Sequence, residues 1–204
     1  MHAKSPNGAL SLASGAGDKR HSLKDRANDL YQTPPEAIAA LLRAEDLPRV
    51  IWEPACGLGA IARPLRAAGR QVYATDLVDY ESPDQDCAGW DFLMEKRAPL
   101  GVEAIVTNPP FKLGRQFVDQ ALSLCPKVIM LLRLAFLESE GRSHILDGGA
   151  LARVHVFRDR LPMMHREGWA GPRSTSTMPF AWFVWEIGWN KPTELHRISW
   201  RREG

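Results

Sequence analysis

Four consecutive residues, Asn108-Pro109-Pro110-Phe111, carry the groups in this chain that most directly suggest chemistry. They follow an apolar run at 104–106, so they are expected at the carboxyl end of a buried strand. Two prolines in succession cannot continue a strand ladder and fix two backbone dihedrals, so their carbonyls are held in place. With an amide before them and an aromatic ring after, they can bind a planar group that carries an NH2. A stiff exit from a strand into a loop is the structural alternative.

A second set of residues lies upstream, at the expected ends of two earlier strands. Glu53-Pro54 ends the first strand, and the turn that follows has glycines at positions 57 and 59, in a G-x-G-x-x-A pattern compatible with a dinucleotide. Asp76 ends the next strand, where a carboxylate can accept hydrogen bonds from two ribose hydroxyls. The acidic Glu53 would repel a pyrophosphate, and it suits a ligand with a positive centre or an amino group.

Together these pieces resemble the motifs of S-adenosylmethionine-dependent methyltransferases. Residues 53–59 resemble motif I, 75–77 motif II, 91–92 motif III, 108–111 motif IV and 31–35 the upstream motif X. The order X, I, II, III, IV is that of the gamma group of adenine-specific (amino) DNA methyltransferases, and the resemblance is to their small, single-domain, often phage-encoded members. It covers residues 31–188.

The resemblance implies S-adenosylmethionine as cofactor and S-adenosylhomocysteine as product. The residues it implies for cofactor binding are Tyr31, Thr33, Pro34, Glu53, Pro54, Ala55, Cys56, Gly57, Gly59, Asp76, Leu77, Asp91, Phe92 and Asn108. Asp76 would hold the ribose hydroxyls and Leu77 would pack on the adenine ring. Asp91 would accept from the adenine amine, although a helix cap is an alternative for it. Cys56 is expected to be a small buried filler and not a nucleophile.

For the reaction, the resemblance implies methyl transfer to the exocyclic amine of an adenine in DNA, flipped out of the helix. The catalytic residues would be Asn108, Pro109, Pro110 and Phe111. The Asn108 side-chain oxygen and the Pro109 carbonyl would accept the two amine hydrogens, Phe111 would stack on the base, and the methyl would transfer in line. An amide cannot take the proton, so orientation and aligned dipoles carry the catalysis and the proton leaves to water.

Other functions stay open at this stage. The same element suits adenine in RNA, and it also suits a protein glutamine amide, although enzymes of that kind more often resemble N-P-P-Tyr and carry an additional helical domain. A nicotinamide oxidoreductase and a non-catalytic nucleic-acid-binding module are more remote. Cytosine-carbon methylation needs a cysteine after a proline, whereas Cys125-Pro126 has the reverse order.

Apolar patterning predicts the elements that must position these groups. Strands are expected over 49–52, 71–75, 104–107, 127–132, 153–157 and 180–187, and helices from 36, over 61–68, over 113–124 and over 138–146. Strands that alternate with helices, with continuously apolar middle strands, are typical of a parallel sheet covered on both faces. The resemblance implies an α/β, Rossmann-like, doubly wound, mostly parallel seven-stranded sheet with a carboxyl-terminal antiparallel hairpin.

Composition sets the remaining expectations. The chain has 204 residues, 45% hydrophobic and 25% charged, with a net charge of +2, as in an ordinary globular protein. Three cysteines without a CxxC pair predict reduced thiols in a cytoplasmic protein and no metal site. No apolar run reaches the roughly 18 residues of a membrane span.

Domain organisation follows from the same patterns. Residues 1–27 are predicted to be a mobile tail, and 28–204 a single methyltransferase domain without a separate target-recognition domain. The predicted partner is nucleic acid, DNA before RNA, and the arginine-bearing connection 158–178 is a candidate contact for it. The sequence leaves the oligomeric state open. The clustered tryptophans 182, 185 and 189 are expected to pack in the core.

Overall fold

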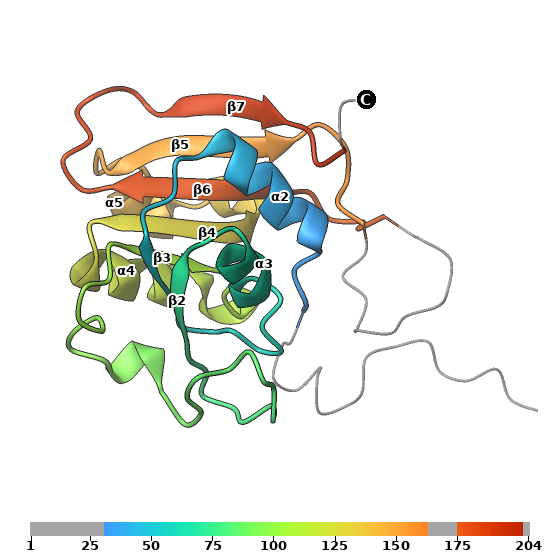
Figure 1. Ribbon diagram of the computed structural model, residues 1–204. Coiled ribbons are helices and arrows are strands. Elements are labelled where there is room, and N and C mark those ends of the chain that lie inside the picture. Colours follow the sequence, from blue (N-terminus) through green and yellow to red (C-terminus); the bar gives the residue numbers. More distant parts are fainter. Residues whose placement is uncertain (1–30, 163–174, 202–204) are drawn as a thin grey trace, which may run out of the picture.

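A single seven-stranded sheet organises the chain in a computed structural model, which describes residues 31–162 and 175–201. The predicted tail, 1–27, and the middle of the predicted contact loop lie outside these residues. The strands are β1 (Val50–Glu53), β2 (Gln71–Ala74), β3 (Ala104–Thr107), β4 (Lys127–Arg133), β5 (Leu151–Phe157), β6 (Phe180–Glu186) and β7 (Glu194–Ile198). Their order is β2-β1-β3-β4-β6-β5-β7 (Figure 1). The predicted α/β, mostly parallel fold is confirmed.

One strand runs against the others. β1 pairs in parallel with β2 and β3, and β3 in parallel with β4. β6 is antiparallel to both β4 and β5, so the predicted carboxyl-terminal hairpin is confirmed. β7 pairs in parallel with β5, so every strand except β6 ends at the same edge of the sheet. We call this edge the carboxyl edge and the opposite one the amino edge.

The seventh strand lies where no strand was predicted. β7 forms one edge of the sheet, and four of its five residues are exposed. Because an exposed edge strand needs no alternation of apolar residues, its polar sequence gave no strand signal. At the other edge, beyond β2, the described residues add no further strand to the sheet. The chain passes from β2 to β3 through loops and the short 3-10 helix η1 (Phe92–Met94).

Helices cover both faces of the sheet, as a doubly wound fold requires. α2 (Pro35–Ala44) and α3 (Ala62–Ala67) lie on one face, and α4 (Gly114–Leu124) and α5 (Ser143–Leu146) on the other (Figure 1). Each face has its own buried apolar cluster. The helix predicted over 138–146 is shorter than expected, because 3-10 turns, η3 (Leu134–Leu137) and η4 (Glu140–Arg142), take up the connection before α5.

Two of the clustered tryptophans confirm the predicted packing role. The side chains of Trp182 and Trp185 on β6 are fully buried. Their indole N–H groups donate to the carbonyls of Ala37, 3.0 Å away on α2, and Ile145, 2.8 Å away on α5. A buried indole needs such a partner, so β6 ties a helix from each face to the centre of the sheet. Trp189 lies beyond β6, under the guanidinium of Arg153.

Charged side chains at the amino edge neutralise one another. Glu45, which caps the carboxyl end of α2, is buried and accepts hydrogen bonds from Arg153 and His155 on β5. Arg153 also binds Glu186 at the end of β6, and Lys127 at the start of β4 lies 3.1 Å from the same carboxylate. This network, Glu45, Lys127, Arg153, His155 and Glu186, joins α2 to three strands. No helix in the described part of the chain is long and apolar enough to cross a membrane.

Candidate functional site

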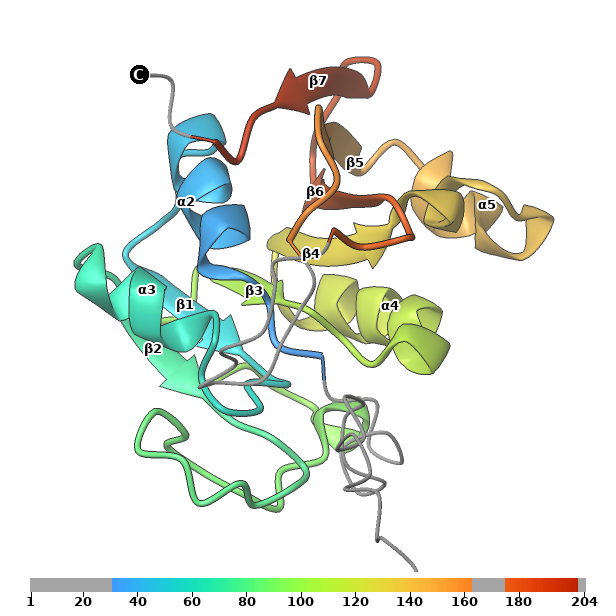
Figure 2. The ribbon, with the colours of Figure 1, turned by 90° about the vertical axis from the view of Figure 1, so that its right-hand side faces the viewer.

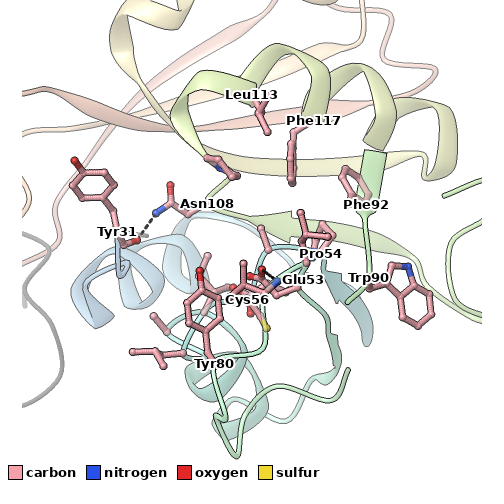
Figure 3. Close-up of a pocket in the computed structure, with 18 of the residues that line it drawn as sticks. Tyr31, Glu53, Pro54, Cys56, Tyr80, Trp90, Phe92, Asn108, Leu113 and Phe117 are labelled. Carbon is pink, nitrogen blue, oxygen red and sulfur yellow. Dashed lines mark hydrogen bonds between the residues drawn. The ribbon is translucent and has the colours of Figure 1, made fainter. Parts of the chain in front are cut away.

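The sheet topology creates a crevice at the carboxyl edge between β1 and β3. The chain leaves β1 to form β2 on one side and later returns to form β3 on the other, so the connections after β1 and β3 diverge. In open α/β sheets, ligands bind at such a switch point. A cavity of about 390 Å³ lies here, within the size range of ligand pockets. Figure 2 looks toward the edge where β5 and β7 end, and Figure 3 shows the cavity residues.

Asn108 follows β3 directly and its side chain has a defined orientation. Its Nδ2 donates to the carbonyl oxygen of Tyr31, 3.0 Å away, as the dashed line in Figure 3 marks. Its Oδ1 is buried and has no hydrogen-bond partner in the described part of the chain. A buried acceptor without a partner is costly unless a ligand supplies the donor. Asn108 therefore presents an acceptor next to the cavity.

Phe111 has neighbours that the sequence did not indicate. Its ring centroid lies 5.0 Å from that of Tyr31 and 5.6 Å from that of Phe180, which begins β6. The guanidinium of Arg133 lies over the ring, 4.5 Å from its centroid. Phe111 and Pro109 are not among the cavity-lining residues, whereas Pro110 is. Phe111 thus belongs to an aromatic cluster at the rim, and its stacking on a base stays a prediction.

Glu53 ends β1 as a nearly inaccessible carboxyl group. Its side chain is 1% exposed, and its Oε2 has no hydrogen-bond partner among the described residues. Burial, and to a smaller extent the charge of Asp76, raise the pKa of Glu53 well above its ordinary value, against a hydrogen bond from the Ala62 amide. A carboxyl group in this state favours a cationic ligand, which would supply the missing partner.

Asp76 holds the glycine turn as well as facing the cavity. Its two carboxylate oxygens accept from the amides of Gly57, 2.9 Å away, and Val78, 3.0 Å away. Burial raises the pKa of Asp76, and these amide hydrogen bonds oppose the rise. Each oxygen keeps a second lone pair. The predicted ribose contact therefore remains available, but the residue also has a structural task that the sequence did not reveal.

The second glycine of the turn serves packing. Gly59 has φ +80°, a conformation that glycine adopts freely. A Cβ at this position would lie 2.2 Å from the Cβ of Asp84, in the loop that follows β2. Gly59 and Gly57 are not among the cavity-lining residues, and their expected place along the cofactor stays a prediction. The missing side chain of Gly59 lets the loop after β2 close over the turn.

An aromatic wall forms one side of the cavity and was mostly missed from the sequence. Phe92, which was predicted, packs edge-on against Trp52 at 5.2 Å and tilted against Phe117 at 4.9 Å. Phe117 lines the cavity from α4, and so does Trp90 from the preceding loop. Trp52 and Phe117 lie far from Phe92 in the chain, so local order gave no signal for them, whereas Trp90 lies only two residues before Phe92 and was missed nonetheless.

Asp91 is a helix cap, which was the alternative considered for it. Its Oδ1 accepts from the Leu93 amide, 3.0 Å away, at the start of η1. It also lines the cavity, so its role toward a ligand stays a prediction. Cys56 is 4% exposed, and burial together with the nearby Glu53 and Asp76 charges raises the pKa of its thiol. This agrees with the expectation of a filler and not a nucleophile.

Most of the predicted residues come together. All of the predicted cofactor residues line the cavity except Pro34, Gly57 and Gly59. The lining residues that were not predicted are Gln32, Leu58, Ala60, Ile61, Val78, Tyr80, Trp90, Leu93, Pro110, Lys112, Leu113 and Phe117; of these, Pro110 was assigned to the reaction. Leu77 is 61% exposed at the cavity, which leaves its side chain available to a ligand ring. Within 31–162 and 175–201, no three His, Cys, Asp or Glu side chains form a metal-binding group.

Comparisons with known proteins identify the fold. No protein-family model matches the chain, and no curated protein is similar to it in sequence. Solved structures do match. A candidate RNA methyltransferase from Pyrococcus horikoshii has a TM-score of 0.58 at 12% identity, over 78% of this chain and 87% of its own. The modification subunit of a candidate type I restriction enzyme from Vibrio vulnificus has a TM-score of 0.56 at 14% identity, and the match covers 89% of this chain and 50% of that subunit.

A third match comes from an enzyme with a stated RNA substrate. The 23S rRNA methyltransferase ErmE has a TM-score of 0.52 at 16% identity, over 78% of this chain and 70% of its own. At these identities the likeness concerns the fold. The seven-stranded sheet, with its crevice at the carboxyl ends of β1 and β3, is the Rossmann-like fold found in methyltransferases.

Proposed function

We propose that this chain transfers a methyl group from S-adenosylmethionine to the exocyclic amine of adenine in DNA. The observation that carries the proposal is the orientation of Asn108. Because its Nδ2 donates to the Tyr31 carbonyl, its Oδ1 is left as an acceptor, and that oxygen is buried without a partner in the described residues. An exocyclic amine supplies the donor that this oxygen lacks.

The cavity residues fit the cofactor. The buried Glu53 carboxyl has an oxygen without a partner in the described residues, which suits the amino group of a methionine moiety. Asp76 lines the cavity at the end of β2, where a carboxylate can accept from two ribose hydroxyls. The wall formed by Phe92 and Phe117, with the exposed Leu77 at the cavity, suits a flat heterocycle. When bound, the cofactor supplies an electrophilic methyl group on a sulfonium.

The residues at the end of β3 act by orientation. The amine lone pair of adenine is delocalised into the ring, which makes the nitrogen a poor nucleophile. Acceptors aimed at both amine hydrogens, Asn108 Oδ1 and the Pro109 carbonyl, favour the geometry in which the lone pair is available. The two prolines fix the backbone before the base binds, so orienting these carbonyls requires little reorganisation free energy. Neither acceptor takes the proton permanently, so it leaves to water.

Adenine in RNA is the second candidate. It is supported by the fold likeness to ErmE, which acts on 23S rRNA, and to the candidate RNA methyltransferase. The Asn108 acceptor reads only the amine, which DNA and RNA share. The resemblance of the motif order to the gamma group of DNA methyltransferases favours DNA.

Incubation with methyl-labelled cofactor and separate DNA, RNA and protein acceptors tests the proposal, with nucleoside analysis of the products. We expect label in N6-methyladenine from DNA. Asn108→Ala should lower the rate about 100- to 1,000-fold, the usual cost of removing one aligned group at a reacting centre, with cofactor affinity within a few-fold of the original. Label in protein only, or full turnover by Asn108→Ala, would overturn the assignment.

A further inference from the structure

Cationic side chains line up along the carboxyl edge, starting beside Asn108. Lys112 follows β3 in the 3-10 helix η2 (Phe111–Leu113), and Arg133 is the last residue of β4. Arg160 follows β5 and Arg201 follows β7. Because these four strands are parallel to one another, their ends lie at the same edge, the one toward which the arrows of β5 and β7 point in Figure 1. We call Lys112, Arg133, Arg160 and Arg201 the edge row.

The outer members of the edge row are joined to one another. The indole N–H of Trp200 donates to the Arg160 carbonyl, 3.2 Å away, and to the Asp159 carbonyl, 3.3 Å away. The guanidinium of Arg201 lies over the Trp200 ring at 4.8 Å and donates to the Asp159 carboxylate at 3.2 Å. The ends of β5 and β7 therefore present one continuous surface with cations and an indole ring.

Most of the edge row has no internal counterion. All four side chains belong to exposed residues. In the described part of the chain, no carboxylate lies within ion-pair distance of Lys112, Arg133 or Arg160, and Arg201 has only its exposed partner Asp159. At the amino edge of the same strands, by contrast, Lys127 and Arg153 are neutralised by Glu45 and Glu186. The edge row thus places cations without strong internal counterions at the edge that holds the cavity, although other exposed cations without an ion pair, such as Arg49, occur elsewhere among the described residues.

We propose that the edge row binds the phosphate backbone of the nucleic-acid strand that carries the acceptor base. This rests on the proposed function and assigns it a substrate-binding surface. From β3 across β4, β6 and β5 to β7 there are four strand spacings, about 19 Å at roughly 4.8 Å each. One strand of a duplex has a phosphate about every 3.4 Å along the axis, so about six phosphates span the row. In this arrangement the nucleic-acid strand extends from β3 toward β7, away from the cofactor half of the crevice at β1 and β2.

Arg133 connects this row to the reaction. Its guanidinium lies on the Phe111 ring, a surface that is also suited to a flipped base. An exposed cation–π contact is worth only about 0.5–1 kcal/mol, so an arriving base can displace the guanidinium. The released side chain, with no carboxylate partner among the described residues, is then available to a phosphate next to the flipped nucleotide. Arg133 is therefore a positioning residue for the acceptor strand.

The test compares Arg133→Gln, Arg160→Gln and their double variant with Arg49→Gln as the matched control. Arg49 is an exposed arginine that directly precedes β1, at the amino edge. Full-length proteins are titrated with a fluorescently labelled DNA duplex that contains adenine, and with its single strands and an RNA of the same sequence, between about 50 and 200 mM salt. Cofactor affinity is measured separately by calorimetry.

Each edge-row substitution is expected to make the negative slope of log affinity against log salt shallower by about 0.9 on duplex DNA, which is about a five-fold loss of affinity near 0.15 M salt. The double variant should lose roughly thirty-fold, because distant contacts add. Cofactor affinity and the Arg49→Gln slope should not change.

The outcomes separate this proposal from the proposed function. Adenine methylation by the original protein, with unchanged salt slopes in both single variants, would overturn the edge row and leave the function standing. An equal loss of DNA affinity in Arg49→Gln would also overturn it, because binding would then depend on the net charge of the protein and not on the position of the arginine. Salt slopes that become shallower as expected, in a protein that methylates no nucleic acid, would support the edge row and overturn the proposed function.

Discussion

Glu45 offers the most quantitative test of how the fold is held together. It is buried at the end of α2, and it accepts hydrogen bonds from Arg153 and His155, the latter at 2.7 Å. Burial alone would raise the pKa of Glu45, but the hydrogen bonds and charges of His155 and Arg153 outweigh it and lower the pKa from 4.5 to about 2. We predict that Glu45→Gln destabilises the protein at neutral pH and not in strong acid.

The magnitude follows from linkage. A fall in pKa from 4.5 to about 2, at about 1.4 kcal/mol per unit, corresponds to about 3 kcal/mol of stabilisation when Glu45 is ionised. The folded state has the lower pKa, so this contribution is complete above pH 4.5 and is lost as the pH falls toward 2. The stability of the original protein should fall by about 1.4 kcal/mol per pH unit in that interval from this group alone.

Urea unfolding, followed by the fluorescence of the buried tryptophans, measures the effect. At pH 7, Glu45→Gln should lose about 3 kcal/mol, close to the cost of breaking a buried ion pair by removing one partner. The difference between variant and original should narrow below pH 4.5 and vanish in strong acid. Glu138→Gln, an exposed glutamate after η3, is the control and should stay within about 0.5 kcal/mol of the original.

Two results would refute this reasoning. A loss below about 1 kcal/mol at pH 7 would mean that the network does not compensate the burial of Glu45. A loss that stays constant on acidification would mean that the effect of the substitution comes from packing and not from the charge.

Three further predictions concern the crevice. Gly59→Ala should lower the free energy of unfolding in urea by about 2–4 kcal/mol, because φ is +80° and the new Cβ would overlap Asp84. Gly101→Ala is the control: its φ is +82° but its surroundings are open, so it should lose only the conformational part, about 1–2 kcal/mol. Equal losses in the two variants would contradict the packing role of Gly59. Asp76→Ala should weaken cofactor binding about ten- to hundred-fold in calorimetry, and unchanged affinity would argue against the ribose contact. Cofactor binding should release a proton from Glu53, whose pKa is raised in the empty protein, and should tighten as the pH rises; a binding enthalpy independent of the buffer's ionisation enthalpy would exclude this.

Local patterns in the chain were enough to predict the crevice in outline. Alternating strand and helix signals placed Glu53, Asp76 and Asn108 at the ends of three parallel strands, and those ends do surround one cavity. This succeeds because side-chain period and turn residues are set by neighbours in the chain, and because parallel strands end at a common edge. β7 was not predicted because a strand signal depends on an apolar period, and a strand exposed at the edge of the sheet has none.

Contacts between distant segments were decided only by the tertiary structure. The Tyr31 carbonyl that orients Asn108 is 77 residues away in the chain. The Arg133 guanidinium on Phe111 and the Phe117 ring beside Phe92 are likewise brought in by other elements. The sequence by itself thus determined which chemical groups stand at the strand ends, because that depends on local order. Which groups have partners and which are left for a ligand depends on packing across the sheet, and only the folded chain decides it.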